Sequence, residues 1–154
     1  MSRWLGLMVG TVSGAVMALG GAAANEDVVF SAESLSGSYV YSNSTDGVAS
    51  FGIIDFDGKG SLTIDIRINA LQPGGQRATI EARGSGSFSI NAEGIGAASI
   101  VMTNGPMQRL DYDFVIVDAN GGLAEEVYAV LRSGGVTGQL VQPTWKRRSN
   151  AAVK

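Results

Sequence analysis

The chain contains no cysteine and no histidine, and only three of its 154 residues are proline. Without cysteine it cannot form disulfides, so its fold must depend on a hydrophobic core. Zinc and copper sites favour the two missing residue types, and a serine nucleophile lacks the usual histidine base. We therefore predict no metal site and no cofactor, and we assign no catalytic residue.

Glycine, by contrast, occurs 22 times without the regular spacing of collagen. So many glycines favour turns and tight strand crossings, which are typical of all-β proteins. Apolar residues make up 45% of the chain and charged residues 16%. This composition favours one compact domain over a disordered chain.

Residues 1–24 have the features of a secretory signal peptide. One positive charge in "MSRW" precedes the uncharged apolar run "LGLMVGTVSGAVMAL", and Ala22 and Ala24 could flank a cleavage site. A retained membrane anchor is the alternative, because three glycines recur at every fourth position of the run. The run is short for a span of ~20 residues, which favours cleavage. We predict a periplasmic or secreted protein with a flexible N-terminal segment at 25–34.

After removal of residues 1–24, ten basic residues remain against fourteen acidic ones, a net charge of minus four. Nucleic acid is therefore not an expected partner. At the other end, Trp145 adjoins three basic residues in "TWKRRSNAAVK". They could touch an anionic membrane, but a short basic end is commonly just solvated. We predict a basic C-terminal tail at 146–154 and no membrane contact apart from export.

Apolar and polar residues alternate in several short segments, and this period of two predicts β-strands. All the apolar residues of "SLTIDIRIN" fall on one face, and "RLDYDFVIV" repeats the pattern. In the second segment we expect Asp111 and Asp113 on the solvated face, opposite Arg67 or Arg83 of neighbouring strands. Further strands are expected at 37–43, 48–55, 77–90, 94–103, 123–132 and 136–142. Residues 123–131 also contain good helix formers, but the glycines on both sides bracket a strand-length segment.

The predicted strands are joined by "DGKG", "NAEG" and "DANGG", which are short and rich in residues that tolerate positive φ. Such connections favour antiparallel hairpins. A sheet of about eight antiparallel strands has two open edges unless it closes on itself. We therefore predict an all-β fold, a single antiparallel up-and-down barrel of about eight strands at residues 35–145. A β-sandwich is the alternative.

An acid-Gly-x-Gly pattern occurs twice, at 57–60 and 93–96. A calcium loop is one interpretation, but Lys59 and Ile66 stand where ligands belong. A phosphate loop is another, but neither copy has the third glycine or a following helix. We interpret both copies as hairpin turns, aligned at an offset of 36 residues (94 minus 58).

The segments "LSGSYVYS", "GIIDFDGKGSLTIDI", "GSFSINAEGIGAASI", "DYDFVIVDANGG" and "VTGQLVQ" cover most of residues 35–142. Together they resemble small exported bacterial proteins with a lipocalin-like or allene-oxide-cyclase-like barrel of the calycin type. The resemblance implies a ligand-carrying barrel or a barrel that steers a reactive substrate, as allene oxide cyclases, dirigent proteins and some polyketide cyclases do. No catalytic motif of these proteins can be placed on this sequence.

Six residues on the predicted strands are candidate ligand-binding residues: Tyr39, Tyr41, Tyr112, Glu126, Tyr128 and Arg132. The first two share one strand face, and the last three share another. If these faces point inward, the phenols and the carboxylate could orient a ligand or move a proton. The alternative is that the tyrosines only fill the core or the rim of the barrel.

Three functions of different classes follow. The first is an exported barrel that binds a small apolar or amphipathic molecule in its interior. The second is a cofactor-free isomerase or cyclase that acts by positioning its substrate. The third is a structural or interaction protein with a filled core. The sequence leaves the oligomeric state open.

Overall fold

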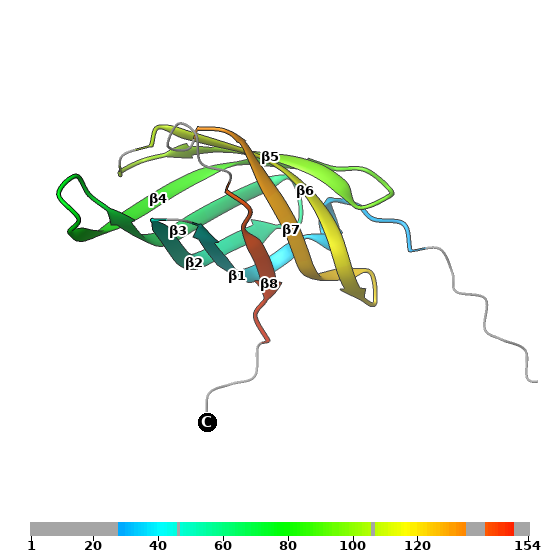
Figure 1. The fold of residues 1–154 in the computed structure, drawn as a ribbon. Helices are drawn as coiled ribbons and strands as arrows, with labels where there is room; N and C mark the ends of the chain where they lie inside the picture. Colours follow the sequence, from blue (N-terminus) through cyan, green and yellow to red (C-terminus); the bar gives the residue numbers. More distant parts are fainter. Residues whose placement is uncertain (1–27, 46, 106, 135–140, 150–154) are drawn as a thin grey trace, which may run out of the picture.

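The structure is a computed structural model that describes residues 28–45, 47–105, 107–134 and 141–149. Its strands form one closed antiparallel barrel in which each strand pairs with its neighbours in the chain, and the last pairs with the first (Figure 1). In chain order they are β1 (Ser36–Thr45), β2 (Val48–Asp57), β3 (Ser61–Leu71), β4 (Arg77–Ile90), β5 (Ile95–Met102), β6 (Arg109–Asn120), β7 (Leu123–Ser133) and β8 (Thr144–Arg147). The predicted eight-stranded up-and-down barrel is confirmed, and the sandwich alternative is wrong.

β3 shows why these residues form strands around one core. Its side chains alternate between buried and exposed along almost its whole length. The buried positions carry leucine or isoleucine, whereas threonine, aspartate and arginine face solvent. A branched apolar side chain fits the half-buried surface of a pleated strand. The alternation therefore fixes which face of β3 lines the barrel and sets its register with β2 and β4.

One half of the barrel interior is filled by aromatic rings. Phe56 lies among Tyr39, Phe88 and Trp145, with ring centroids 5.4, 5.1 and 5.6 Å from its own. Phe114 adds a further ring, with its centroid 5.4 Å from that of Trp145. The pairs of Phe56 with Tyr39 and Phe88 meet edge to face, the arrangement that aromatic quadrupoles favour. This half of the barrel is a packed core.

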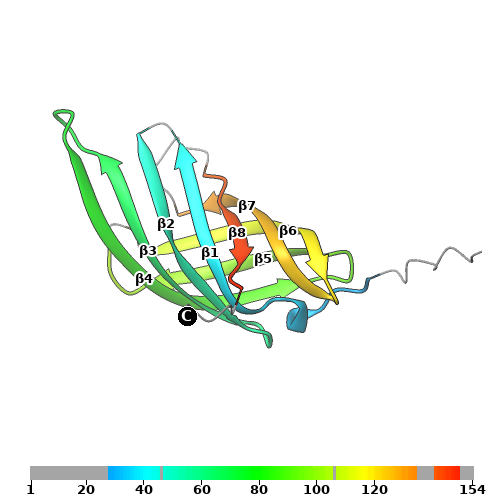
Figure 2. The same ribbon diagram turned by 90° about the horizontal axis from the view of Figure 1, so that it is seen from below.

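The chain before β1 covers the same end of the barrel. A short 3-10 helix, η1 (Ala32–Ser34), leads into Leu35, which is fully buried. Upstream, the Phe30 amide donates a 3.1 Å hydrogen bond to the Ala92 carbonyl in the turn between β4 and β5. Figure 2 shows η1 at the end where β1 begins. Residues 30–34 of the predicted flexible segment 25–34 are therefore bound to the barrel end, because Phe30 and Ala32 pack against the core, whereas Val28 and Val29 are exposed.

The hairpin turns confirm our interpretation of the acid-Gly-x-Gly pattern but correct the alignment of its two copies. Asp57 Oδ1 accepts hydrogen bonds from the backbone N–H groups two and four residues later, at 2.7 and 2.8 Å. In the second turn the equivalent acceptor is Asn91 rather than Glu93. Gly60 and Gly94 then correspond, and both have positive φ. A short side chain must cap each turn, which glutamate is too long to do.

The end of the chain differs from the prediction. The predicted strand at 136–142 falls partly on residues 135–140, which lie outside the described residues. The described residues 141–143 belong to no strand, and β8 instead includes two residues assigned to the basic tail. Trp145 is 0% exposed, so the barrel closes through the residues beside it. Burial of that indole stabilises this position of β8, while the Lys146 side chain stays on the outer face and the Arg147 guanidinium is bound by backbone carbonyls.

The predicted signal peptide lies outside the described residues. No helix in the described part of the chain is long and apolar enough to cross a membrane.

Candidate functional site

Two phenols meet in the middle of the barrel interior. The hydroxyl oxygens of Tyr41 on β1 and Tyr112 on β6 lie 3.3 Å apart, and both residues are almost fully buried. Burial raises the pKa of the Tyr41 hydroxyl, although hydrogen bonds with Tyr112 and Ser50 oppose that rise. Burial also raises the pKa of Tyr112 well above its usual value, and the nearby Tyr41 adds to this. Both phenols are therefore neutral at physiological pH and can donate or accept a hydrogen bond.

A second pair of polar residues lies farther from η1. Asn43 on β1 stands directly opposite Ser50 on β2, and each is only 7% exposed. The Asn43 Oδ1 atom is buried and has no hydrogen-bond partner among the described residues, and the same holds for Trp145 Nε1. A buried polar atom without a partner costs about 1–3 kcal/mol. These atoms could be satisfied by a water molecule or by a polar group of a ligand.

The inner wall around this polar pair is apolar. Ile68 and Met102 are buried, and Ile80 and Leu131 are only partly buried. These side chains come from β3, β5, β4 and β7 and lie at the end of the barrel opposite η1. We call this the open end. An apolar wall around a few convergent polar groups is the usual composition of a small-molecule site.

No charged side chain faces into the open end among the described strands. The inward positions there carry apolar residues, Asn43, Thr45, Ser50 and the two phenols. An ionised ligand group placed among them would be desolvated without a counter-charge, which is strongly unfavourable. The arrangement therefore suits an uncharged polar group.

Tyr39, which we predicted as a ligand-binding residue, lies inside the barrel but has a structural partner. Its hydroxyl donates a 2.8 Å hydrogen bond to the Ala124 carbonyl and accepts one from Arg147. The Arg147 guanidinium also donates to the Ala124 and Ser36 carbonyls, both at 2.7 Å, so it joins β8 to β7 and β1. Burial raises the pKa of Tyr39 to about 12 despite the nearby cation. Tyr39 therefore belongs to the seam that closes the barrel.

The three candidates on β7 share one face, as predicted, but that face is the outer one. Glu126 forms an ion pair with Lys146 at 3.3 Å, and Arg132 forms one with Asp113 at 3.0 Å. Tyr128 is 53% exposed and lines a shallow depression of about 280 Å³ beside β8. Smaller apolar side chains of the same strand fill the interior instead. None of these three can contact a ligand inside the barrel.

Asp111 is the most perturbed carboxyl of the outer wall. It accepts hydrogen bonds from Arg109 at 2.9 Å and from the Ser133 hydroxyl at 2.6 Å. Hydrogen bonds from Ser133, Ser99 and Arg109 lower its pKa to about 2. Asp111 therefore shares the outer face with Asp113, but the expectation that it is solvated is wrong, because Asp111 is only 8% exposed, whereas Asp113 is exposed as expected.

The predicted arginine partners of that outer face are wrong. Arg67 pairs with Glu81 and Arg83 pairs with Asp65, because these residues stand directly opposite on β3 and β4. Asp111 and Asp113 instead take Arg109 and Arg132. Sequence patterns fix the face of a strand but not the register of its neighbours.

Sequence reasoning missed Asn43 and Ser50. The alternation in the sequence could have indicated Asn43, because it lies on the same strand face as Tyr39 and Tyr41, two residues after Tyr41. Nothing in the sequence distinguished Ser50 from the many other serines of the chain. Within the described ranges, no three acidic side chains are grouped so that they could hold a metal ion.

Comparisons of the chain with protein families, with curated proteins and with solved structures found no match. The fold is consistent with a lipocalin-like barrel in general. No comparison supports the more specific resemblance to allene oxide cyclases.

Proposed function

We propose that the chain is an exported barrel that binds a small, uncharged amphipathic molecule at its open end. Export rests on the sequence of residues 1–24. The binding proposal is carried by Asn43, whose buried Oδ1 atom has no partner among the described residues and lies beside an apolar wall. The ligand's apolar body would contact Ile68, Ile80 and Met102, while its polar group would reach Asn43.

The phenol pair supports binding better than catalysis. A general base should have a pKa near the working pH, whereas burial moves the pKa values of Tyr41 and Tyr112 upward. The allene-oxide-cyclase-like alternative would need the neutral phenols to hold a reactive conformer by shape alone. A bound molecule that leaves chemically changed would favour this alternative.

The test is native mass spectrometry of the full chain, purified from the extracytoplasmic fraction of its own host. We expect an adduct that is lost on denaturation and whose mass fits a neutral amphipathic compound. The Asn43→Leu variant should lose the adduct, and the matched control Asn69→Leu, on the outer face of β3, should keep it. A wild-type protein that stays free of adduct after incubation with neutral lipids and polyketides would favour the filled-core alternative.

A further inference from the structure

The inner faces of β1 to β4 divide the wall of the open end into a polar column and an apolar surface. Three cross-strand rows show this division, each with one residue from β1, β2, β3 and β4 in that order: Tyr41–Gly52–Ile66–Ala82, Asn43–Ser50–Ile68–Ile80 and Thr45–Val48–Ala70–Ala78. The β1 residue is polar in every row, and the β3 and β4 residues are always apolar. The polar groups therefore follow one strand along the barrel wall.

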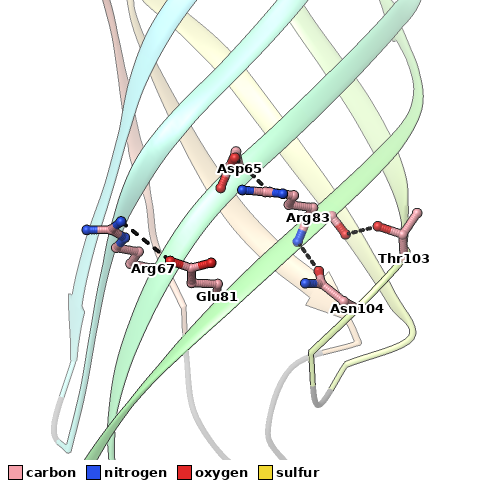
Figure 3. A network of polar contacts seen from close by, with 6 residues as sticks. All are labelled: Asp65, Arg67, Glu81, Arg83, Thr103 and Asn104. Atoms are coloured by element: carbon pink, nitrogen blue, oxygen red, sulfur yellow. Dashed lines mark hydrogen bonds and ion pairs between the residues drawn. The ribbon is translucent and has the colours of Figure 1, made fainter.

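The charged side chains of the apolar surface lie on its opposite, outer side. Arg67 pairs with Glu81, and Arg83 pairs with Asp65, across β3 and β4 (Figure 3). The loop after β5 is bound beside them, because Asn104 Oδ1 accepts the Arg83 N–H at 2.6 Å. All these side chains are exposed, so a ligand inside the barrel would meet no charge on these two strands.

Two atoms of the polar column are buried and have no hydrogen-bond partner among the described residues: Asn43 Oδ1 and Thr45 Oγ1. The Tyr41 hydroxyl, by contrast, lies 3.3 Å from that of Tyr112 and is also hydrogen-bonded with Ser50. Residues two apart on a strand share a face, and their Cα atoms lie about 7 Å apart. The unsatisfied atoms therefore form a pair along the wall.

The two atoms differ in the groups that they can bind. An amide oxygen only accepts hydrogen bonds, so the group that satisfies Asn43 must be a hydroxyl or an N–H. The Thr45 hydroxyl can donate or accept, so a hydroxyl or a carbonyl suits it. Leaving a buried polar atom without a partner is costly, so a ligand that satisfies both atoms should bind more tightly than one that satisfies a single atom.

We propose that the ligand of the open end carries two uncharged polar groups along one edge, about 7 Å apart, with a donor facing Asn43 and a second hydroxyl or a carbonyl facing Thr45. Its other edge is apolar and lies against Ile68, Ile80 and Ala78. A hydroxylated polyketide has this form, whereas a lipid with a single polar head does not. This inference rests on the proposed function, because it needs a ligand at the open end.

The experiment is a calorimetric titration of the full chain with two isomeric long-chain diols. One carries its hydroxyls on the first and sixth carbons, about as far apart as the two side chains, and the other carries them on adjacent carbons. We expect the first diol to bind at least tenfold more tightly, about 1.4 kcal/mol. Thr45→Val removes the hydroxyl and keeps the side-chain shape, so it should abolish this preference. The matched control Thr63→Val, on the outer face of β3, should keep it.

A long-chain alcohol in the same titration separates this inference from the proposed function. If the alcohol binds and Asn43→Leu weakens its binding, but the two diols bind equally, the paired site is wrong and the open end is still a binding site. A preference that persists in folded Thr45→Val also overturns the paired site. If neither the alcohol nor the diols bind, both the inference and the proposed function fail. The comparison of the two diols uses the wild type, so it holds even if a variant does not fold.

Discussion

The two ends of the barrel interior are built from different chemistry. Beneath η1 the inner positions carry interlocking aromatic rings, and even the polar groups of Tyr39 and Arg147 are paired with backbone carbonyls. At the open end Asn43 and Ser50 take the place of the rings, and the Asn43 oxygen has no partner among the described residues. Trp145 Nε1 also has no partner among them, but the indole is enclosed by other aromatic rings. The first end has the features of a structural core, and the second has those of a binding site.

A single strand, β1, contributes to both ends of the interior. At successive inward positions it places Tyr39 beneath η1, Tyr41 in the middle and Asn43 at the open end. Substitutions of inward side chains should therefore destabilise the fold strongly beneath η1 and hardly at all at the open end. Their effect on ligand binding should be smallest beneath η1 and largest at the open end.

The largest effect is expected for Trp145→Ala in the aromatic half. The indole is 0% exposed and contacts three rings on two other strands, so its removal should cost about 3–5 kcal/mol of unfolding free energy. Urea denaturation followed by circular dichroism measures this. Phe51→Ala is the matched control, since Phe51 is 59% exposed and its loss should matter little. An equal loss of unfolding free energy in the two variants would contradict a packed core in the aromatic half of the barrel.

A smaller loss is expected for Arg147→Met at the seam. The substitution leaves the carbonyls of Ser36 and Ala124 without their charged donor, and a hydrogen bond to a charged group contributes about 1.5–3 kcal/mol. Arg132→Met removes an exposed ion pair and should change stability by about 0–1 kcal/mol. The same denaturation experiment compares them. If Arg132→Met proves the more harmful, Arg147 does not hold the seam.

The stability of the outer wall should depend on acidic pH through Asp111. The folded-state pKa of Asp111 is lowered to about 2 from a usual value of 3.8. Its contribution to stability is therefore complete above pH ~4 and is lost as the pH falls toward ~2. Melting temperatures measured across this window should fall less steeply for Asp111→Asn than for the wild type. Identical slopes would mean that Asp111 is not held by Ser133 and Arg109 in solution.

The smallest effect on folding is expected for Asn43→Leu at the open end. The substitution removes an oxygen that has no partner among the described residues and keeps a similar volume, so the unfolding free energy should change by less than ~1 kcal/mol. A loss of several kcal/mol would show that Asn43 makes structural hydrogen bonds. The open end would then be part of the structural core rather than a binding site.

The sequence predicted the barrel because period-two alternation and short glycine turns are local signals. Leu62 to Ile68 and the turn at Asp57 could be interpreted without knowledge of the rest of the chain. The same alternation grouped Tyr39 with Tyr41 on one strand face and Glu126 with Tyr128 on another. Each face was defined only relative to its own strand, so the sequence left open which of them points into the barrel.

Other features depend on contacts between distant residues, which alternation does not encode. Trp145 is in the core because β8 closes the barrel between β1 and β7, although its neighbours in sequence are basic. The register shifts between β6 and β7 near Asp118 allow Ala124 and Val127 both to face inward. Asn43 and Ser50 became visible as a pair only through the register of β1 with β2.

The most direct test of the binding proposal is a calorimetric titration of the full chain with a long-chain alcohol and with the carboxylate of the same length. The open end offers hydrogen bonds but no counter-charge, so we expect the alcohol to bind at least tenfold more tightly, about 1.4 kcal/mol. Asn43→Leu should remove this preference. Equal binding of the two compounds, or tighter binding of the carboxylate, would contradict a site for uncharged ligands. Failure of both to bind would contradict the open end as a site for amphipathic molecules of this kind.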